Sequence, residues 1–210
     1  MKWTKNRQRP GEKKVVSRAD AVAIMITAGA AAAVTTFLTV SGIIETLTGP
    51  VTLTLPLHSS HQSPTGLGLD SVARFTSMEA SIPALPAGEA VLLAWAGALN
   101  QVSFLAVMAL LFLLAFRLRG ENLFTPSSAW IVGTCGAVLA LAGTVAQALG
   151  AAARNRIAEL IGANQRTPGE SIGFVAEFNF LPLLAGVVLV LVAGVFQFGR
   201  RLQRDTEGLI

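Results

Sequence analysis

The chain has 210 residues, of which 52% are hydrophobic and only 13% charged, and its mean hydropathy is +0.60. This composition excludes an ordinary soluble globular domain and indicates a polytopic membrane protein. The net charge is +4, but seven of the sixteen lysines and arginines precede Asp20, so we expect them to contact lipid headgroups and expect no direct nucleic-acid partner.

Four apolar stretches follow the basic leader, residues 1–20. Each is long enough to cross ~30 Å of hydrocarbon at ~1.5 Å per residue, and none contains Asp, Glu, Lys, Arg or His between its ends. They are residues 21–44, 91–116, 129–149 and 180–198. The predicted fold is an all-α membrane protein, a four-transmembrane-helix bundle. The first span exceeds the ~7–15 residues of a secretory signal and is expected to be an uncleaved signal anchor.

The distribution of Lys and Arg predicts the orientation of the chain. The leader, residues 117–128 and residues 199–210 together hold twelve of them, whereas residues 45–90 and 150–179 hold four. Both termini are therefore expected in the cytoplasm. All four lysines lie in the leader, tyrosine is absent and the spans are rich in alanine and glycine, which is typical of a GC-rich bacterial genome. We therefore expect a bacterial plasma membrane protein.

The extracytoplasmic loop after the first span contains predicted strands. Residues 51–57, VTLTLPL, alternate apolar residues with threonine, and a second alternation runs through residues 71–86. This period predicts two or three short, half-buried strands. Pro56, Pro83 and Pro86 are expected at strand ends or edges, because proline cannot donate to a sheet ladder.

Two histidines between these strands form an H-x-x-H pair, His58 and His61. A metal site needs at least one more ligand, and the nearest carboxylates, Asp70 and Glu79, stand at no characteristic spacing. We therefore expect a solvated loop here, with no metal and no cofactor. The single cysteine, Cys135, can form no intramolecular disulfide.

The second extracytoplasmic loop begins with a helical pattern at residues 151–161, where Ile157, Leu160 and Ile161 share one face. The simpler interpretation is that the third span continues beyond the membrane and ends near Gly162. The alternative is a separate helix lying along the membrane surface.

Polar residues recur in the outer halves of the spans. Two interpretations are open: they line a polar cavity, or they form hydrogen bonds between helices, which contribute ~0.6–2 kcal/mol each. The residues are Thr35, Thr36, Thr39, Asn100, Gln101, Gln147, Glu177 and Asn179, with Glu45 at the end of the first span.

Small residues also recur at helical spacing, and they predict close helix packing within one chain or between copies in a homo-oligomer. The pairs are Gly133 with Ala137, Gly136 with Ala140, Ala140 with Thr144, and Gly186 with Gly194.

The spans lack the residues of intramembrane chemistry. None contains the Asp, His or Lys that intramembrane hydrolysis requires, and the chain has no glycine-rich phosphate-binding loop. Pro182 is the single proline inside a span and has no counterpart in the first half, which argues against a transporter acting alone. We therefore expect a protein that is not an enzyme and has no catalytic or cofactor-binding residues.

The cytoplasmic side consists of the leader, the loop at residues 117–128 and the tail at residues 199–210. In the loop, Thr125 and Pro126 suit the N-cap and first position of a helix, and Ser127 and Ser128 continue its first turn. In the tail, three arginines are expected to contact an anionic inner leaflet. The apolar-ended remainder, residues 205–210, is a candidate docking element for a cytoplasmic protein.

These features together resemble a bacterial membrane family catalogued as domain of unknown function 2975. The resemblance covers residues 19–210: four spans, a strand-bearing first outer loop, Gly120 before the Phe124–Thr125 pair, and the tail VFQFGRRLQRDTEGLI. Its most specific positions are Phe196, Gly199, Leu202, Gln203, Glu207, Leu209 and Ile210. The family has no established activity. Its members are often encoded beside a small helix-turn-helix regulator, which implies a membrane partner for such a regulator.

Three functional hypotheses follow. The first is a regulatory or sensory protein whose outer strands sense a signal and whose inner loop and tail engage a cytoplasmic partner. The second is a structural or accessory subunit of a membrane complex. The third is a small-molecule carrier that uses the outer polar residues.

Overall fold

The computed structural model describes residues 18–56, 77–119, 126–163 and 178–207. They form four helices, α1 (Arg18–Thr48), α2 (Ala87–Arg119), α3 (Pro126–Leu160) and α4 (Leu181–Glu207), and two strands, β1 (Val51–Pro56) and β2 (Ser77–Ile82). All four helices are long and apolar enough to cross a membrane. The predicted class, an all-α multi-pass membrane protein with a small strand-bearing loop, is confirmed.

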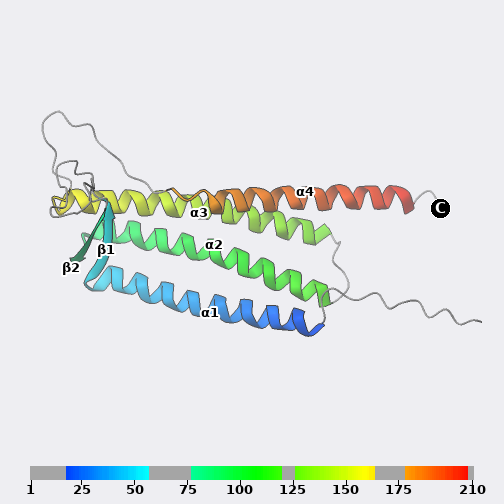
Figure 1. The fold of residues 1–210 in the computed structure, drawn as a ribbon, viewed down its shortest axis with the longest axis horizontal. Coiled ribbons are helices and arrows are strands. Elements are labelled where there is room, and N and C mark those ends of the chain that lie inside the picture. The colour runs from blue at the N-terminus through cyan, green and yellow to red at the C-terminus, as the bar shows by residue number, and fades with distance from the viewer. Residues whose placement is uncertain (1–17, 57–76, 120–125, 164–177, 208–210) are drawn as a thin grey trace, which may run out of the picture.

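The helices pack in chain order. Figure 1 shows α1, α2 and α3 side by side and α4 lying along α3, and the extensive contacts are those of α1 with α2, α2 with α3, and α3 with α4. In the apolar stretch of α3, 33% of the residues are buried, against 11% in α1 and in α4. The two middle helices therefore form the interior, while large apolar side chains on α1 and α4, such as Phe37 and Phe198, face outward.

The helices are longer than the predicted spans. At 33 and 35 residues, α2 and α3 measure roughly 50 Å at 1.5 Å per residue, well beyond a ~30 Å hydrocarbon core. The predicted spans ended where the apolar residues end. The helices themselves continue into the polar residues on either side. The tail also continues α4 as far as Glu207, and Glu45, expected at the end of the first span, lies inside α1.

Both strands lie at one end of the helices, here called the hairpin end (Figure 1). The first helix stops where Gly49 and Pro50 follow it, since proline has no N–H to continue the ladder. The two strands pair antiparallel, with Val51 opposite Ile82 and Pro56 opposite Ser77. This confirms the predicted alternation, and Pro56 stands at a strand end as expected.

The hairpin packs on the last turns of α3. Leu55 of β1 and Ile157 and Ala158 of α3 are fully buried against one another. Five half-buried side chains surround this contact from the strands and α2, namely Leu53, Met78, Ala80, Ile82 and Leu93. The hairpin is therefore attached to α3 by a small apolar core of its own.

The third helix runs without a break to Leu160, so the alternative of a separate surface helix is wrong. It ends as predicted near Gly162, whose φ of 73° is accessible to glycine at little cost. The Ala163 N–H donates to the Ala158 carbonyl at 3.0 Å, which satisfies one of the last carbonyls of the helix.

Glycine allows α3 and α4 to approach closely. A Cβ atom added at Gly186 would lie 2.5 Å from the Gly136 carbonyl oxygen, and one added at Gly136 would lie 2.7 Å from the Gly186 carbonyl oxygen. The predicted Gly136 and Ala140 pair is therefore used within the chain, against Gly186. Gly194, predicted as the partner of Gly186 in this pattern, has no atom within 4 Å of its Cβ position.

The same contacts show that α4 begins beside the middle of α3. Pro182 lies against Gly143, and Ala193 lies against Gly133. Gly143 precedes the last helical residue, Leu160, by 17 positions, so about 26 Å of α3 extends past the start of α4.

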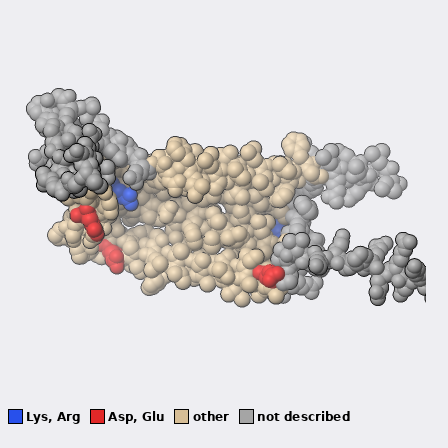
Figure 2. Space-filling view, in the orientation of Figure 1, with Lys and Arg blue, Asp and Glu red and all other residues tan. Residues whose placement is uncertain are grey.

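The charged side chains lie at the two ends. On the face shown in Figure 2, acidic and basic groups of the described residues occupy the hairpin end and the opposite end, here called the Arg117 end, and the surface between them carries none. This is the distribution expected of a protein whose middle lies in hydrocarbon.

Candidate functional site

Gln101 joins α2 to α1 inside the apolar region. Its side-chain Nε2 donates to Thr36 Oγ1 at 2.9 Å and to Thr35 Oγ1 at 3.2 Å, and its Oε1 accepts from Thr39 Oγ1 at 3.1 Å. The hydroxyls of Thr35 and Thr36 donate to carbonyls one turn earlier in α1, which leaves their oxygens free to accept. The carboxamide thus has a partner for both amide hydrogens and for its oxygen.

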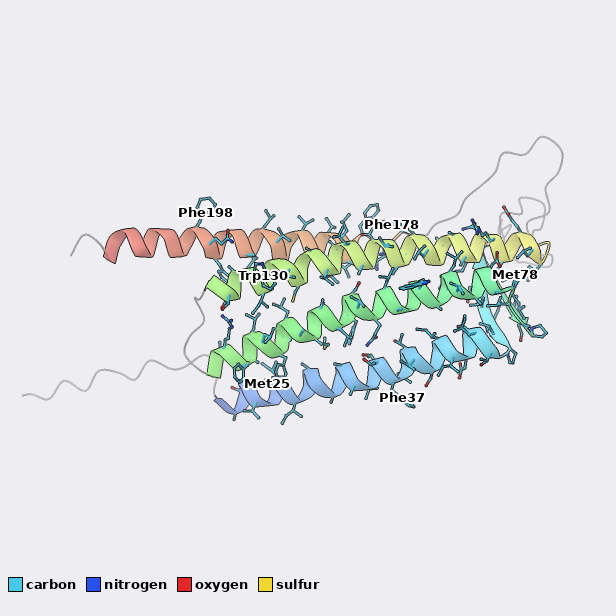
Figure 3. The ribbon with its side chains drawn as sticks, turned by 180° about the vertical axis from the view of Figure 1, so that it is seen from behind. Met25, Phe37, Met78, Trp130, Phe178 and Phe198 are labelled. Atoms are coloured by element: carbon cyan, nitrogen blue, oxygen red, sulfur yellow. The ribbon has the colours of Figure 1, made fainter. Side chains whose placement is uncertain are left out.

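The position of these threonines follows from helical periodicity. Thr35, Thr36 and Thr39 lie on one face of α1, since residues three and four apart are neighbours on a helix. In Figure 3, Phe37 points to the opposite side, away from α2. One glutamine on α2 can therefore bond to three threonines on α1.

Gln147 fastens the start of α4 to α3. Its Nε2 donates to the Asn179 carbonyl at 3.0 Å, and its Oε1 accepts from the Asn179 backbone N–H at 2.7 Å. The Asn179 side chain in turn accepts from the Leu181 N–H at 2.9 Å, which satisfies one of the backbone donors in the first turn of α4. Two carboxamides therefore satisfy backbone groups where the chain enters the helix.

These polar residues lie at one depth. Ser103, two residues from Gln101, is 3.5 Å from the Cβ position of Gly143, and Gly143 is one helical turn before Gln147. The polar residues of the four helices thus form one layer, here called the carboxamide belt. Its members are Thr35, Thr36, Thr39, Asn100, Gln101, Gln147 and Asn179.

The belt is the candidate site that the polar residues of the sequence indicate. Of the two interpretations, the hydrogen bonds favour contacts between helices, because Gln101 and Gln147 each bond to the neighbouring helix or to its entry. The side chain of Asn100, another member of the belt, forms no hydrogen bond among the described residues. Glu177, also named from the sequence, lies outside the described residues.

One buried polar atom near the belt has no partner. The Thr144 hydroxyl oxygen is buried, and no hydrogen bond reaches it within the described part of the chain. Thr144 stands one turn before Gln147 on α3. Most buried polar groups in folded proteins have a partner, so this hydroxyl lowers the stability of the packing around it.

At the Arg117 end, the last turn of α2 is tied to the first turn of α3. The Arg117 guanidinium donates to Ser127 Oγ at 2.6 Å and to the buried hydroxyl of Ser128. From the sequence, Arg117 was expected only to add to the positive charge of the cytoplasmic side. Its contact with the two serines was not predicted. The third helix begins at Pro126, as the N1 preference of proline predicts, while its expected N-cap Thr125 lies outside the described residues.

The histidine pair, His58 and His61, also lies outside the described residues. Within residues 18–56, 77–119, 126–163 and 178–207, no group of three His, Cys, Asp or Glu side chains is placed to hold a metal ion. Glu79, considered as a third ligand, is exposed on β2.

Comparison with known proteins finds no protein-family model, no curated protein and no solved structure that matches this chain. The family resemblance stays a prediction that rests on the residues quoted for it.

Proposed function

We propose that this chain is a non-enzymatic regulatory or sensory membrane protein, which receives a signal at its hairpin end and engages a cytoplasmic protein at its Arg117 end. The proposed partner is a small helix-turn-helix regulator, as the resemblance to the family of domain of unknown function 2975 implies. The proposed location is a bacterial plasma membrane, with both termini in the cytoplasm and the basic leader against an anionic inner leaflet.

The observation that carries this proposal is the attachment of the hairpin to α3. Leu55 is buried against Ile157 and Ala158, so a displacement of the hairpin must displace the end of α3 or open that core. The same helix continues without interruption to Pro126, where Ser127 and Ser128 contact Arg117. A rigid helix joins the two ends, and packed rigid elements are what carry energetic coupling between distant sites.

The carboxamide belt gives less support to the hypothesis of a small-molecule carrier. A carrier presents unsatisfied donors and acceptors to its cargo, whereas the Gln101 and Gln147 carboxamides are engaged within the chain. An accessory subunit is supported by the outward apolar faces of α1 and α4, which such a subunit would use to join a complex.

Affinity capture from native membranes tests the proposal directly. The full chain is expected to retain a DNA-binding regulator, and a variant that lacks residues 206–210 is expected to lose it while still inserting in the membrane. Capture that is unchanged by this deletion refutes docking through the tail. Capture of transport or envelope subunits alone supports the accessory role instead.

The orientation has a separate test. Alkaline phosphatase fused after Ser63 is expected to be active, and the same enzyme fused after Gln203 is expected to be inactive, because this enzyme matures outside the cytoplasm. The reverse pattern overturns the proposed orientation, since positively charged loops are expected to remain inside.

A further inference from the structure

Asn100 is a carboxamide exposed on the apolar part of α2. The nearest charged residues of that helix are Glu89, eleven positions before it, and Arg117, seventeen positions after it. At 1.5 Å per residue these lie about 17 Å and about 26 Å away along the axis. Asn100 therefore lies within the hydrocarbon, and its short side chain cannot reach either surface.

The hydrogen bonds of the carboxamide belt do not include this side chain. Its neighbour Gln101 bonds to α1, and Ser103 bonds to the carbonyl of Leu99 in its own helix. Among the described residues no hydrogen bond is made to the Asn100 carboxamide. Lipid chains offer neither donors nor acceptors, so the group is costly to leave exposed there.

The surroundings of Asn100 admit another helix. Two and three turns along the Asn100 face of α2, Val107 is half-buried and Leu111 is exposed, so α1 and α3 do not cover this face completely. Ala96, Gly97 and Ser103, which flank this face, pack against α3 and α1 within the chain. A second helix would therefore approach along the line from Asn100 through Val107 to Leu111.

We propose that α2 is a self-association surface, at which the Asn100 carboxamides of two copies of this chain pair reciprocally. Each carboxamide has N–H donors and an acceptor oxygen, so two of them related by a two-fold axis form two equivalent hydrogen bonds. Two copies inserted in the same direction place Asn100 at the same depth. A second copy therefore supplies a complementary carboxamide at the depth of Asn100, and no further partner is needed.

The first experiment compares the full-length wild-type chain with Asn100→Leu and Asn100→Gln, by energy transfer between labelled copies in phosphatidylcholine vesicles over a range of protein-to-lipid ratios. We expect Asn100→Leu to weaken dimerisation roughly tenfold, the loss of a few interhelical hydrogen bonds. Asn100→Gln keeps a carboxamide and should retain most of the association. A wild-type chain that stays monomeric at every ratio overturns the proposal, as does equal association of wild type and Asn100→Leu.

The second experiment locates the face and leaves Asn100 intact. In a Cys135→Ala background, which removes the single native cysteine, Val107→Cys places a thiol two turns along the Asn100 face. The control Ala109→Cys is nine positions from Asn100, about 180° around the helix. Oxidation should cross-link the first variant at least several times faster than the second, and adding Asn100→Leu should abolish this difference. Equal cross-linking of the two variants refutes the assigned face.

Discussion

Replacing Gly186 by alanine tests the closest helix contact in the protein. The new Cβ would lie 2.5 Å from the Gly136 carbonyl oxygen, 2.7 Å from the Ala140 Cβ and 2.8 Å from the Ala140 nitrogen. Two of these three are backbone atoms, which cannot move without moving α3. The two helices must therefore separate to admit one methyl group.

The expected cost follows from the packing. Inserting a methyl group into a well-packed contact costs about 1–3 kcal/mol, and the separation also removes dispersion contacts along the ladder formed by Gly133, Ala140 and Ala193. Alanine gains up to about 1 kcal/mol over glycine in a helix. This gain has to be removed from the comparison before the packing cost can be measured.

Gly194→Ala provides that correction. Gly194 belongs to the same helix and has nothing within 4 Å of its Cβ position, so the substitution changes helix propensity without a clash. Unfolding of both variants in mixed micelles with increasing sodium dodecyl sulphate, followed by circular dichroism, should show Gly186→Ala less stable than Gly194→Ala by about 1–3 kcal/mol. Equal stability of the two variants would refute the close approach of α3 and α4.

Four further predictions use the same unfolding assay or limited proteolysis. Gln101→Leu should lower the free energy of unfolding by about 1–2 kcal/mol through lost interhelical hydrogen bonds, and no loss would contradict the bonds to α1. Gln147→Leu should expose the start of α4 to cleavage, whereas cleavage at the wild-type rate would mean that α4 is held otherwise. Thr144→Val removes an unpaired buried hydroxyl and should be neutral or stabilising, so a marked loss would reveal a hidden partner. Leu55→Ala should release the hairpin, with a local cost of about 2–5 kcal/mol and faster cleavage there; an unchanged hairpin would refute its attachment to α3.

The sequence was sufficient to predict the elements of this fold because each has a local signature. Runs of apolar residues mark the helices, and the alternation in VTLTLPL marks β1. The end of α3 was predictable from Gly162, since a glycine just beyond a helix often takes the left-handed conformation. These signals lie within a few residues of the structure that they specify.

The pairing of polar residues could not be predicted in the same way. That Gln101 meets Thr35, Thr36 and Thr39 depends on the relative depth of α1 and α2, and no local pattern contains that quantity. The same holds for Asn179, which the sequence placed among candidate cavity residues; in the structure it bonds to the first turn of α4 and is held by Gln147. Both interactions require the helices to be assembled first.

The late start of α4 leaves it with the shortest charge-free stretch of the four helices. Residues 181–199 of α4 carry no charge and measure about 28 Å, close to the ~30 Å of an average bilayer, while the charge-free stretches of α1, α2 and α3, residues 21–44, 90–116 and 126–153, have 24, 27 and 28 residues. The three longer stretches leave a margin of a few residues before a charged side chain enters the hydrocarbon, whereas the stretch of α4 leaves none. A change in lipid chain length therefore affects α4 first: in a thinner bilayer it can tilt against the glycine surface of α3, and in a thicker one the bilayer must thin around it.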